Sequence, residues 1–294
     1  MRALWLLVAA CGTDPGITGA RSCWSAWQTG TIRFAPPALL DAVSSPSYDR
    51  DPSLTADELV MYVSSTRSPS TSDDLWVATR ATRDDAWSAP ELDTALSSPA
   101  SETKISFTAD GLYAVLGSSR DGGTGALDVW ETTRASTTDA WATPVQTSMA
   151  AVNTVYDDHD PEISADGLHL YLAPSAPGLQ HLVVAARGAL DEPFAAPAPL
   201  LELDSGSGDS DPTVSPDETV IVFSSQRGGA GYGGGNLWYA ARAAPGEPFG
   251  APQPVPDVNG ARDEGDGHLT SDGCTLYFAS DAGTSWDIYT AAAR

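Results

Sequence analysis

Residues 211 to 225 read Asp211-Pro-Thr-Val-Ser-Pro-Asp217-Glu-Thr-Val-Ile-Val-Phe-Ser-Ser225. A short extended stretch runs into a Ser-Pro-Asp turn, and a run rich in β-branched and aromatic residues follows, as buried strands prefer. The arrangement occurs five times, 51 to 56 residues apart, with turn aspartates at Asp57, Asp110, Asp166, Asp217 and Asp272. A unit that repeats with this period is typical of an array of identical supersecondary structures.

Two further markers keep the same register. An aromatic-x-x-Pro precedes each turn, and its aromatic residues are Phe34, Trp87, Trp141, Phe194 and Phe249. A single arginine follows each turn by 21 to 25 residues, at Arg80, Arg134, Arg187, Arg242 and Arg294. Three markers in register over five copies indicate one repeated unit and one domain.

Each copy contains four strand patterns, and its prolines restrict the last of them to an edge. Four antiparallel strands with such an outer edge are typical of a propeller blade. The fifth copy stops after its third strand, whereas residues 34–40 supply a fourth-strand pattern with no copy of its own. We therefore predict an all-β chain with a single five-bladed β-propeller at residues 34–294, its ring closed by an N-terminal strand in the C-terminal blade.

Several segments resemble the WD-like β-propeller repeats of the TolB type. They are Asp211-Pro-Thr-Val-Ser-Pro-Asp-Glu, Ser224-Ser-Gln-Arg227-Gly-Gly and Asp128-Val-Trp130. The resemblance covers about residues 34–294 and implies a propeller used as an envelope scaffold or binding module. The third copy departs most, because Pro174-Ser-Ala-Pro-Gly replaces its Ser-x-Arg loop, and we expect an irregular blade there.

The N-terminus has the pattern of an exported lipoprotein. Arg2 precedes an apolar run, and Val8-Ala-Ala-Cys11 resembles a lipobox, in which the cysteine is lipidated. We expect a signal peptide at residues 1–10, a tether at 11–33 and lipidation of Cys11. By resemblance to Gram-negative lipoproteins, Gly12 implies an outer-membrane protein that faces the periplasm or the cell surface.

The other two cysteines, Cys23 and Cys274, are an even pair in an exported chain. Such a pair is a disulfide candidate in an oxidising compartment. Ring closure brings the segment before Phe34 towards the last blade, where Cys274 precedes the second strand.

The composition restricts the partners. A net charge of −24, with Lys104 as the only lysine, repels phosphate backbones and argues against nucleic-acid binding. We expect a monomer that meets the membrane only through its lipid anchor and whose partner is an envelope protein or a glycan.

Carboxylates gather upstream of every turn. Eight residues before the turn aspartate they are Asp49, Glu102, Asp158, Asp209 and Glu264, and six residues before it they are Asp51, Asp160, Asp211 and Asp266, with Lys104 as the exception. The residue three before the turn is always apolar, so strand alternation predicts that the acidic set faces the central channel. We expect a ring of carboxylates at one channel mouth, with Ser53, Ser106, Glu162, Thr213 and His268 below it.

This ring has three interpretations. Its oxygens suit a Ca²⁺ or Mg²⁺ ion, although no cofactor is required by the sequence. The negative charge also suits a cationic peptide or an amino sugar. The structural alternative is that the side chains cap backbone N–H groups and pair with the recurring arginines, and recurrence in every blade favours it.

No nucleophile elbow, zinc motif or phosphate-binding loop is present. The sequence therefore favours a non-enzymatic envelope lipoprotein that recognises protein or glycan. The alternative is a glycoside-active enzyme that uses two or three channel carboxylates as acid and base.

Overall fold

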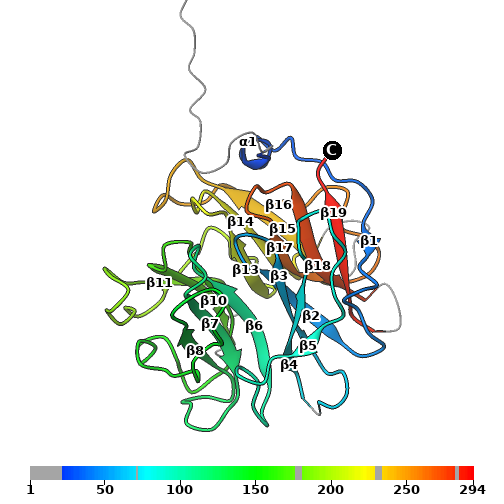
Figure 1. The fold of residues 1–294 in the computed structure, drawn as a ribbon. Helices are drawn as coiled ribbons and strands as arrows, with labels where there is room; N and C mark the ends of the chain where they lie inside the picture. Colours follow the sequence, from blue (N-terminus) through cyan, green and yellow to red (C-terminus); the bar gives the residue numbers. More distant parts are fainter. Residues whose placement is uncertain (1–21, 71, 176–180, 229–233, 282–284) are drawn as a thin grey trace, which may run out of the picture.

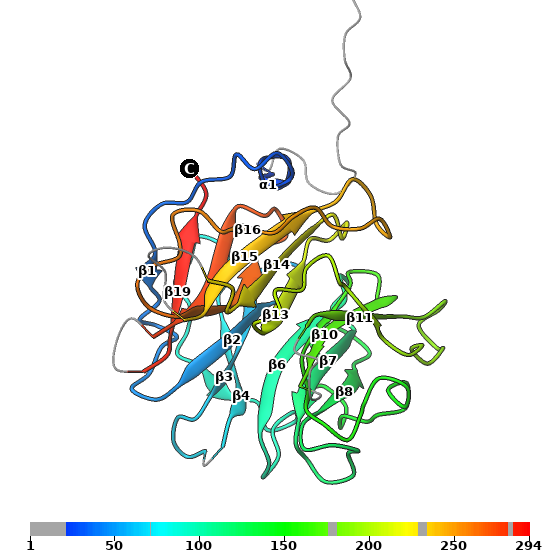
Figure 2. The same ribbon diagram turned by 180° about the vertical axis from the view of Figure 1, so that it is seen from behind.

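The structure is a computed structural model that describes residues 22–294, apart from residue 71 and segments 176–180, 229–233 and 282–284. Five antiparallel sheets are arranged around a central axis, as Figures 1 and 2 show from opposite sides. The five-bladed propeller predicted from the repeat is confirmed. Within the described part of the chain, no helix is both long and apolar enough to cross a membrane.

Each blade begins with a strand beside the axis, and neighbouring inner strands contact one another around the whole ring. These inner strands are β2 (Asp49–Leu54), β6 (Glu102–Phe107), β9 (Asp158–Ile163), β13 (Asp209–Val214) and β17 (Glu264–Leu269). The second strands are β3 (Val60–Ser65), β7 (Tyr113–Ser118), β10 (His169–Pro174), β14 (Val220–Ser225) and β18 (Thr275–Ser280). We number the blades 1 to 5 in this order.

The third strands are β4 (Asp74–Thr79), β8 (Asp128–Thr133), β11 (Val183–Ala186), β15 (Asn236–Ala241) and β19 (Asp287–Ala292). In blade 3, β11 has only four residues, consistent with the irregularity expected there, and the Ser-x-Arg replacement lies partly outside the described residues. The outer strands are two residues long because prolines and turns surround them: β5 (Glu91–Leu92), β12 (Ala198–Pro199), β16 (Gln253–Pro254) and β1 (Ala38–Leu39). Blade 2 has a single bridge, Glu131 to Val145, at this place.

The ring closes as the sequence predicted. β1 pairs with β19 through Ala38–Thr290 and Leu39–Tyr289, and Phe34 forms a further bridge to Ala293. Before β1, the short helix α1 (Trp24–Gln28) contacts β14 and β15 of blade 4, and it lies above these strands in both views. The N-terminal segment therefore completes blade 5.

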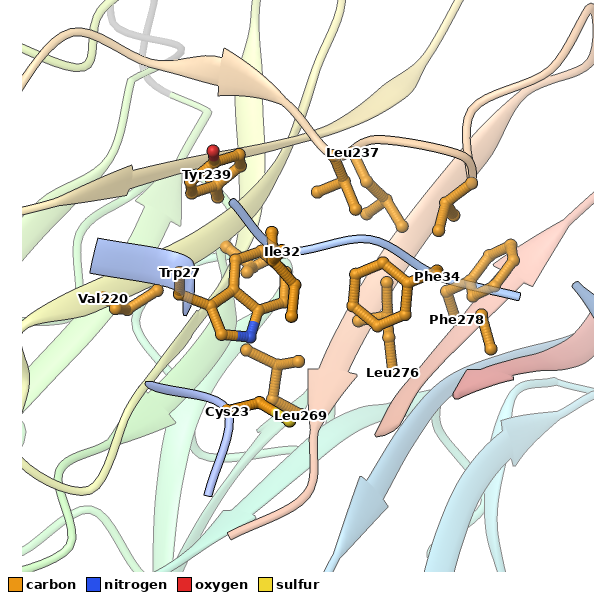
Figure 3. Packing of buried hydrophobic residues seen from close by; sticks show 14 residues of the cluster. Cys23, Trp27, Ile32, Phe34, Val220, Leu237, Tyr239, Leu269, Leu276 and Phe278 are labelled. Carbon is orange, nitrogen blue, oxygen red and sulfur yellow. The ribbon is translucent and has the colours of Figure 1, made fainter. Parts of the chain in front are cut away.

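We call the contact of residues 23–39 with blades 4 and 5 the closure seam. Figure 3 shows Trp27, Ile32 and Phe34 packed between Tyr239 and Leu237 of blade 4 and Leu276 and Phe278 of blade 5. Trp27 and Phe34 are fully buried. Cys23 forms a disulfide with Cys274, their Cα atoms 5.1 Å apart. Burial of two large aromatic side chains and a covalent bond fix the ring at this seam.

The three sequence markers meet in space. Arg134 donates from Nε to the carbonyl of Gly111 in the turn (2.7 Å) and stacks on Trp141, the aromatic of aromatic-x-x-Pro. The same contacts join Arg80 to Trp87, Arg187 to Phe194 and Arg242 to Phe249. The recurring arginines thus fasten the turn to the outer strand, and the expectation that they pair with the strand-entry carboxylates is wrong.

The residue after each turn aspartate has a positive φ, a conformation that glycine adopts freely. Gly111, Gly167 and Gly273 occupy it in three blades, whereas Glu58 and Glu218 do so in blades 1 and 4. Both glutamates reach the preceding blade in the ring: Glu218 accepts the hydroxyl of Tyr171 (2.6 Å), and Glu58 accepts that of Ser271 (2.8 Å). These side chains link neighbouring blades.

Candidate functional site

The two sets of strand-entry carboxylates have separate environments. At the residue six before the turn or directly after it, every inner strand carries one extra residue relative to its partner, which shifts the register. In four blades the residue six before the turn adopts a positive φ of 51° to 56°, as Asp tolerates better than most residues. We call these four residues, Asp51, Asp160, Asp211 and Asp266, the mouth aspartates.

The outer carboxylates, eight before the turn, are Asp49, Glu102, Asp158, Asp209 and Glu264, all buried. One oxygen of each accepts a backbone N–H from four residues upstream; Asp209, for example, accepts that of Ser205 (2.7 Å). In blades 1, 2 and 4 the other oxygen pairs with the arginine of Ser-x-Arg. The expected single ring of nine carboxylates is therefore wrong, because internal hydrogen bonds hold the outer set within its own blade.

The mouth aspartates instead converge on the axis. One carboxylate oxygen from each of Asp51, Asp211 and Asp266 lies within 4.8 Å of the others. They also link neighbouring blades: the N–H of Asp51 donates to Asp266 (3.4 Å), and that of Asp211 donates to Asp160 (3.3 Å). The four side chains thus form one cluster, to which blades 1, 3, 4 and 5 each contribute one aspartate.

Opposite pKa shifts divide this cluster. Burial, then the charges of Asp160 and Asp51, raises the pKa of Asp211 to about 7. Burial and the charges of Asp211 and Asp51 likewise hold the pKa of Asp266 well above its usual range. Burial opposes the ionisation of Asp160, but His159, 2.6 Å away, holds the pKa of that carboxyl below its ordinary value. The mouth therefore combines an ionised carboxylate with carboxyls that retain protons near neutral pH.

Below the mouth aspartates, polar side chains cross the channel. Lys104 of blade 2 is buried and donates across the channel to the carbonyl of Pro212 in blade 4. Its Nζ also lies 3.6 Å from a carboxylate oxygen of Glu162. His268 accepts the N–H of Leu54 at Nε2 (3.2 Å), and burial lowers its pKa to about 3. His268 lies below the mouth aspartates, as the sequence predicted, but its neutral imidazole accepts from a neighbouring strand, so it does not join the acidic cluster as a candidate ligand.

A cavity of about 510 Å³ opens above the mouth, between blades 3, 4 and 5. Its lining includes Asp211, Asp266, Glu264 and the indole of Trp286. The ring of Trp286 lies beside Gly265, since a Cβ placed on that glycine would meet it at 3.7 Å. Polar side chains that can donate hydrogen bonds complete the wall: Ser210, Ser224, Gln226 and His159. Its volume is that of a small-molecule site.

The mouth aspartates have the oxygen chemistry that hard divalent cations prefer, and Asp51, Asp211 and Asp266 would be the ligands. A second group of potential ligands, Asp166, His169 and Glu218, lies at the opposite end of the blades. There Nδ1 of His169 bonds to Glu218 at 3.0 Å.

Sequence reasoning assigned no functional role to two residues of this region, Trp286 in the cavity wall and Lys104 in the channel below it. Trp286 follows a loop partly outside the described residues and carries no repeat signal. Lys104 was recognised only as an exception to the pattern, yet it crosses the channel from blade 2 to blade 4. The signal that could have found both is departure from the repeat.

Comparison with known proteins confirms the fold. No family profile and no curated protein sequence matches the chain. Among solved structures, the catalytic domain of a Coprinopsis cinerea GH62 α-L-arabinofuranosidase matches with a TM-score of 0.59 at 13% identity, over 89% of this chain and 97% of that one. The arabinanase Arb43A of Bacillus subtilis gives 0.54 at 11% identity, over 86% and 96%. TolB from Acinetobacter baumannii gives 0.50 at 12% identity, over 85% of this chain and 55% of that one. At these identities the likeness is one of fold.

Proposed function

We propose that this protein recognises a carbohydrate in the cavity above the acidic channel mouth. The observation that carries the proposal is the lining itself: an indole ring, several carboxyl groups and several hydroxyl or amide donors face one space of about 510 Å³. Sugars present apolar ring faces, which stack on aromatic rings, and hydroxyl groups, which both donate and accept hydrogen bonds. The structural neighbours include an arabinofuranosidase and an arabinanase, which makes arabino-oligosaccharides a rational first probe.

Calorimetric titration tests this proposal. Arabino-oligosaccharides and glucosamine oligomers are titrated in EDTA and again in Ca²⁺, because the cluster oxygens suit that ion. Trp286→Ala should weaken binding at least about tenfold through loss of the stacking surface. The matched control is Tyr48→Ala, since Tyr48 is an exposed aromatic that does not line the cavity. Absence of binding by the wild-type protein to both classes of oligosaccharide would contradict the proposal.

Hydrolysis of a glycosidic bond is the second candidate. It is favoured by the opposite pKa shifts, which would let Asp160 act as the ionised base and Asp211 as the proton donor. The spacing favours recognition instead, because glycosidase carboxyl groups stand about 5 to 9.5 Å apart. Here the side chains of Asp160 and Asp211 are close enough to share a hydrogen bond, and one oxygen from each of Asp51, Asp211 and Asp266 lies within 4.8 Å of the others. Chromatography of the titrated oligosaccharides distinguishes the two, since only hydrolysis yields shorter products that disappear in Asp160→Asn.

We also propose that the protein acts at the cell envelope as a lipoprotein. The support is the lipobox-like sequence, which lies outside the described residues, and a disulfide that suits an oxidising compartment. Expression in a Gram-negative host with labelled palmitate should label the wild-type protein and place it in the membrane fraction. Cys11→Ser should abolish both, and an unlabelled wild-type protein would contradict the assignment.

A further inference from the structure

Three blades hold an arginine in the same cage. In blade 4, Nε of Arg227 donates to Ser225 (2.8 Å), and its guanidinium also donates to Asp209 (2.9 Å) and to the carbonyl of Leu203. The guanidinium stacks 5.1 Å from the ring centre of Trp238. Two other arginines have the same four partners, in the order carboxylate, serine, carbonyl and ring. In blade 1 Arg67 has Asp49, Ser65, Val43 and Trp76. In blade 2 Arg120 has Glu102, Ser118, Leu96 and Trp130.

Blade 5 has residues of the same kinds at the cage positions, but its sequence has no arginine at the Ser-x-Arg position. Glu264 pairs in register with Ser280 as Asp209 does with Ser225. Tyr289 stands opposite Phe278, as Trp238 stands opposite Phe223. Val258 stands six residues before Glu264, as Leu203, whose carbonyl accepts from Arg227, stands six before Asp209. Two residues after Ser280 the sequence has Ala282 in place of the arginine.

The carboxylate of this cage lacks an internal cation. One oxygen of Glu264 accepts the N–H of Gly260 (3.0 Å), as its counterparts do in the other blades. Within the described residues, no arginine or lysine forms an ion pair with it. Burial and the charges of Asp263 and Asp281 raise the pKa of Glu264 to about 7. A buried carboxylate without a cationic partner is costly to ionise, and an external cation would relieve that cost.

The carboxylate end of the cage is reachable from outside, because Glu264 lines the cavity above the mouth, whereas Ser280, Val258 and Tyr289 do not line it. We propose that the blade 5 cage, formed by Glu264, Ser280, the carbonyl of Val258 and the ring of Tyr289, binds a guanidinium group from another molecule. In blades 1, 2 and 4 a flat guanidinium bonds a carboxylate, a hydroxyl and a carbonyl at once and stacks on an aromatic ring, which a tetrahedral ammonium does not do equally well. The proposal does not rest on carbohydrate binding, although Glu264 also lines the cavity proposed for the carbohydrate.

Methylguanidinium is the probe, with methylammonium at the same ionic strength as its control. Methylguanidinium should raise the melting temperature of the wild-type protein saturably, with a dissociation constant on the order of 1 mM, and methylammonium should not. Binding should tighten from pH 6 to pH 8 as Glu264 loses its proton. Glu264→Gln should weaken binding by about tenfold or more, whereas Glu247→Gln, an exposed loop substitution, should leave it unchanged.

Two variants use the repeat as an internal standard. Arg227→Ala opens the corresponding cage in blade 4 and should add a second, saturable response to methylguanidinium. Ala282→Arg restores the Ser-x-Arg spacing and should abolish the blade 5 response. A tripeptide amide Gly-Arg-Gly distinguishes a peptide source from a free guanidinium compound, because a peptide site should bind it more tightly than methylguanidinium. A wild-type protein that shows no saturable response, or responds equally to methylammonium, would overturn the proposal.

Discussion

The closure seam and the channel mouth join the blades by opposite chemistry. At the seam, Trp27 and Phe34 are fully buried among apolar side chains, and a disulfide holds the segment in place. At the mouth, buried carboxyl groups meet at the axis in backbone conformations that most residues avoid. The seam lowers the free energy of the fold, whereas like charges brought together at the mouth raise it.

This contrast indicates where function lies. An assembly of blades needs apolar seams, but it does not need a cluster of carboxyl groups that oppose one another's ionisation. Groups with strongly perturbed pKa values in a cavity are candidates for a functional site. The outer carboxylates of blades 1, 2 and 4 support this reading, because they are equally buried but are neutralised by arginine and need no external partner.

The largest expected effect comes from opening the seam disulfide. Cys23 and Cys274 are 251 residues apart, so their bond restricts the unfolded chain strongly. Replacement of both by serine should cost about 5 kcal/mol in the chain-entropy model. Urea unfolding of the variant and of the reduced wild-type protein measures the loss, and the two should agree. A loss below about 1 kcal/mol would show that packing alone closes the ring.

Phe34→Ala is expected to have the next largest effect. Its side chain is fully buried in the seam, so the substitution leaves a cavity and should cost about 4 kcal/mol. Leu39→Ala is the matched control from the same closing segment, since Leu39 is 42% exposed and should cost less than about 1 kcal/mol. Equal losses in denaturant unfolding would contradict the assignment of the seam to Phe34.

At the mouth, two aspartates of the same cluster should respond in opposite directions. At pH 8, Asp160→Asn removes the partner of protonated His159 and should destabilise the fold by about 3 kcal/mol. Asp211→Asn removes a carboxylate that its neighbours repel and should leave stability unchanged or raise it by about 1 kcal/mol. Thermal unfolding of both variants provides the comparison. Equal destabilisation would mean that the mouth, like the seam, serves the fold alone.

The last expected effect is a dependence on pH, which for one group over one pH unit is smaller than the Asp160→Asn effect. The pKa values of Asp211 and Glu264 are raised to about 7, so the folded state binds their protons more tightly than the unfolded state does. Their contribution is complete below pH 4 and is lost as pH rises through 7. The pKa of His159 is raised to about 9, and its contribution is lost between about pH 6.5 and 9. The free energy of unfolding should therefore fall from pH 5 to pH 9, by about 1.4 kcal/mol for each proton and pH unit, and the melting temperature should fall with it.

Glu264→Gln tests the origin of this slope. It removes one of the titrating groups and should flatten the change between pH 5 and pH 7 without altering the change above pH 8. An unchanged slope would show that Glu264 titrates normally in the folded protein.

The sequence predicted the fold because each blade needs the same bonds. The turn, the recurring arginine and the aromatic of aromatic-x-x-Pro recur together because, in the first four copies, the arginine donates to the carbonyl of the residue after the turn aspartate and stacks on the aromatic. The missing fourth strand of the last copy even predicted that residues 34–40 would close the ring. Such repeated contacts leave a periodic signal that a single sequence reveals.

The site could not be predicted to the same degree, because it depends on differences between blades. Alternation placed Asp209 and Asp211 on one face, but the extra residue between strand partners separates their environments. The role of Lys104 depends on reaching a carbonyl 108 residues away, and that of Trp286 depends on the shape of a cavity between blades. Neither the long-range contact of Lys104 nor the shape of the cavity beside Trp286 is encoded in a local sequence pattern.

The closing strand also has a consequence for the order of synthesis. Residues 34–39 leave the ribosome before any blade exists, yet their partner strand β19 contains the last residues of the last blade. Blades 1 to 4 can form as they emerge, but the ring remains open until residue 292 is available. During that interval the apolar side chains of Trp27 and Phe34 have no permanent site. A nascent chain stalled after blade 4 should therefore be a client for chaperones that bind exposed apolar segments, and release of the last twenty residues should end that dependence.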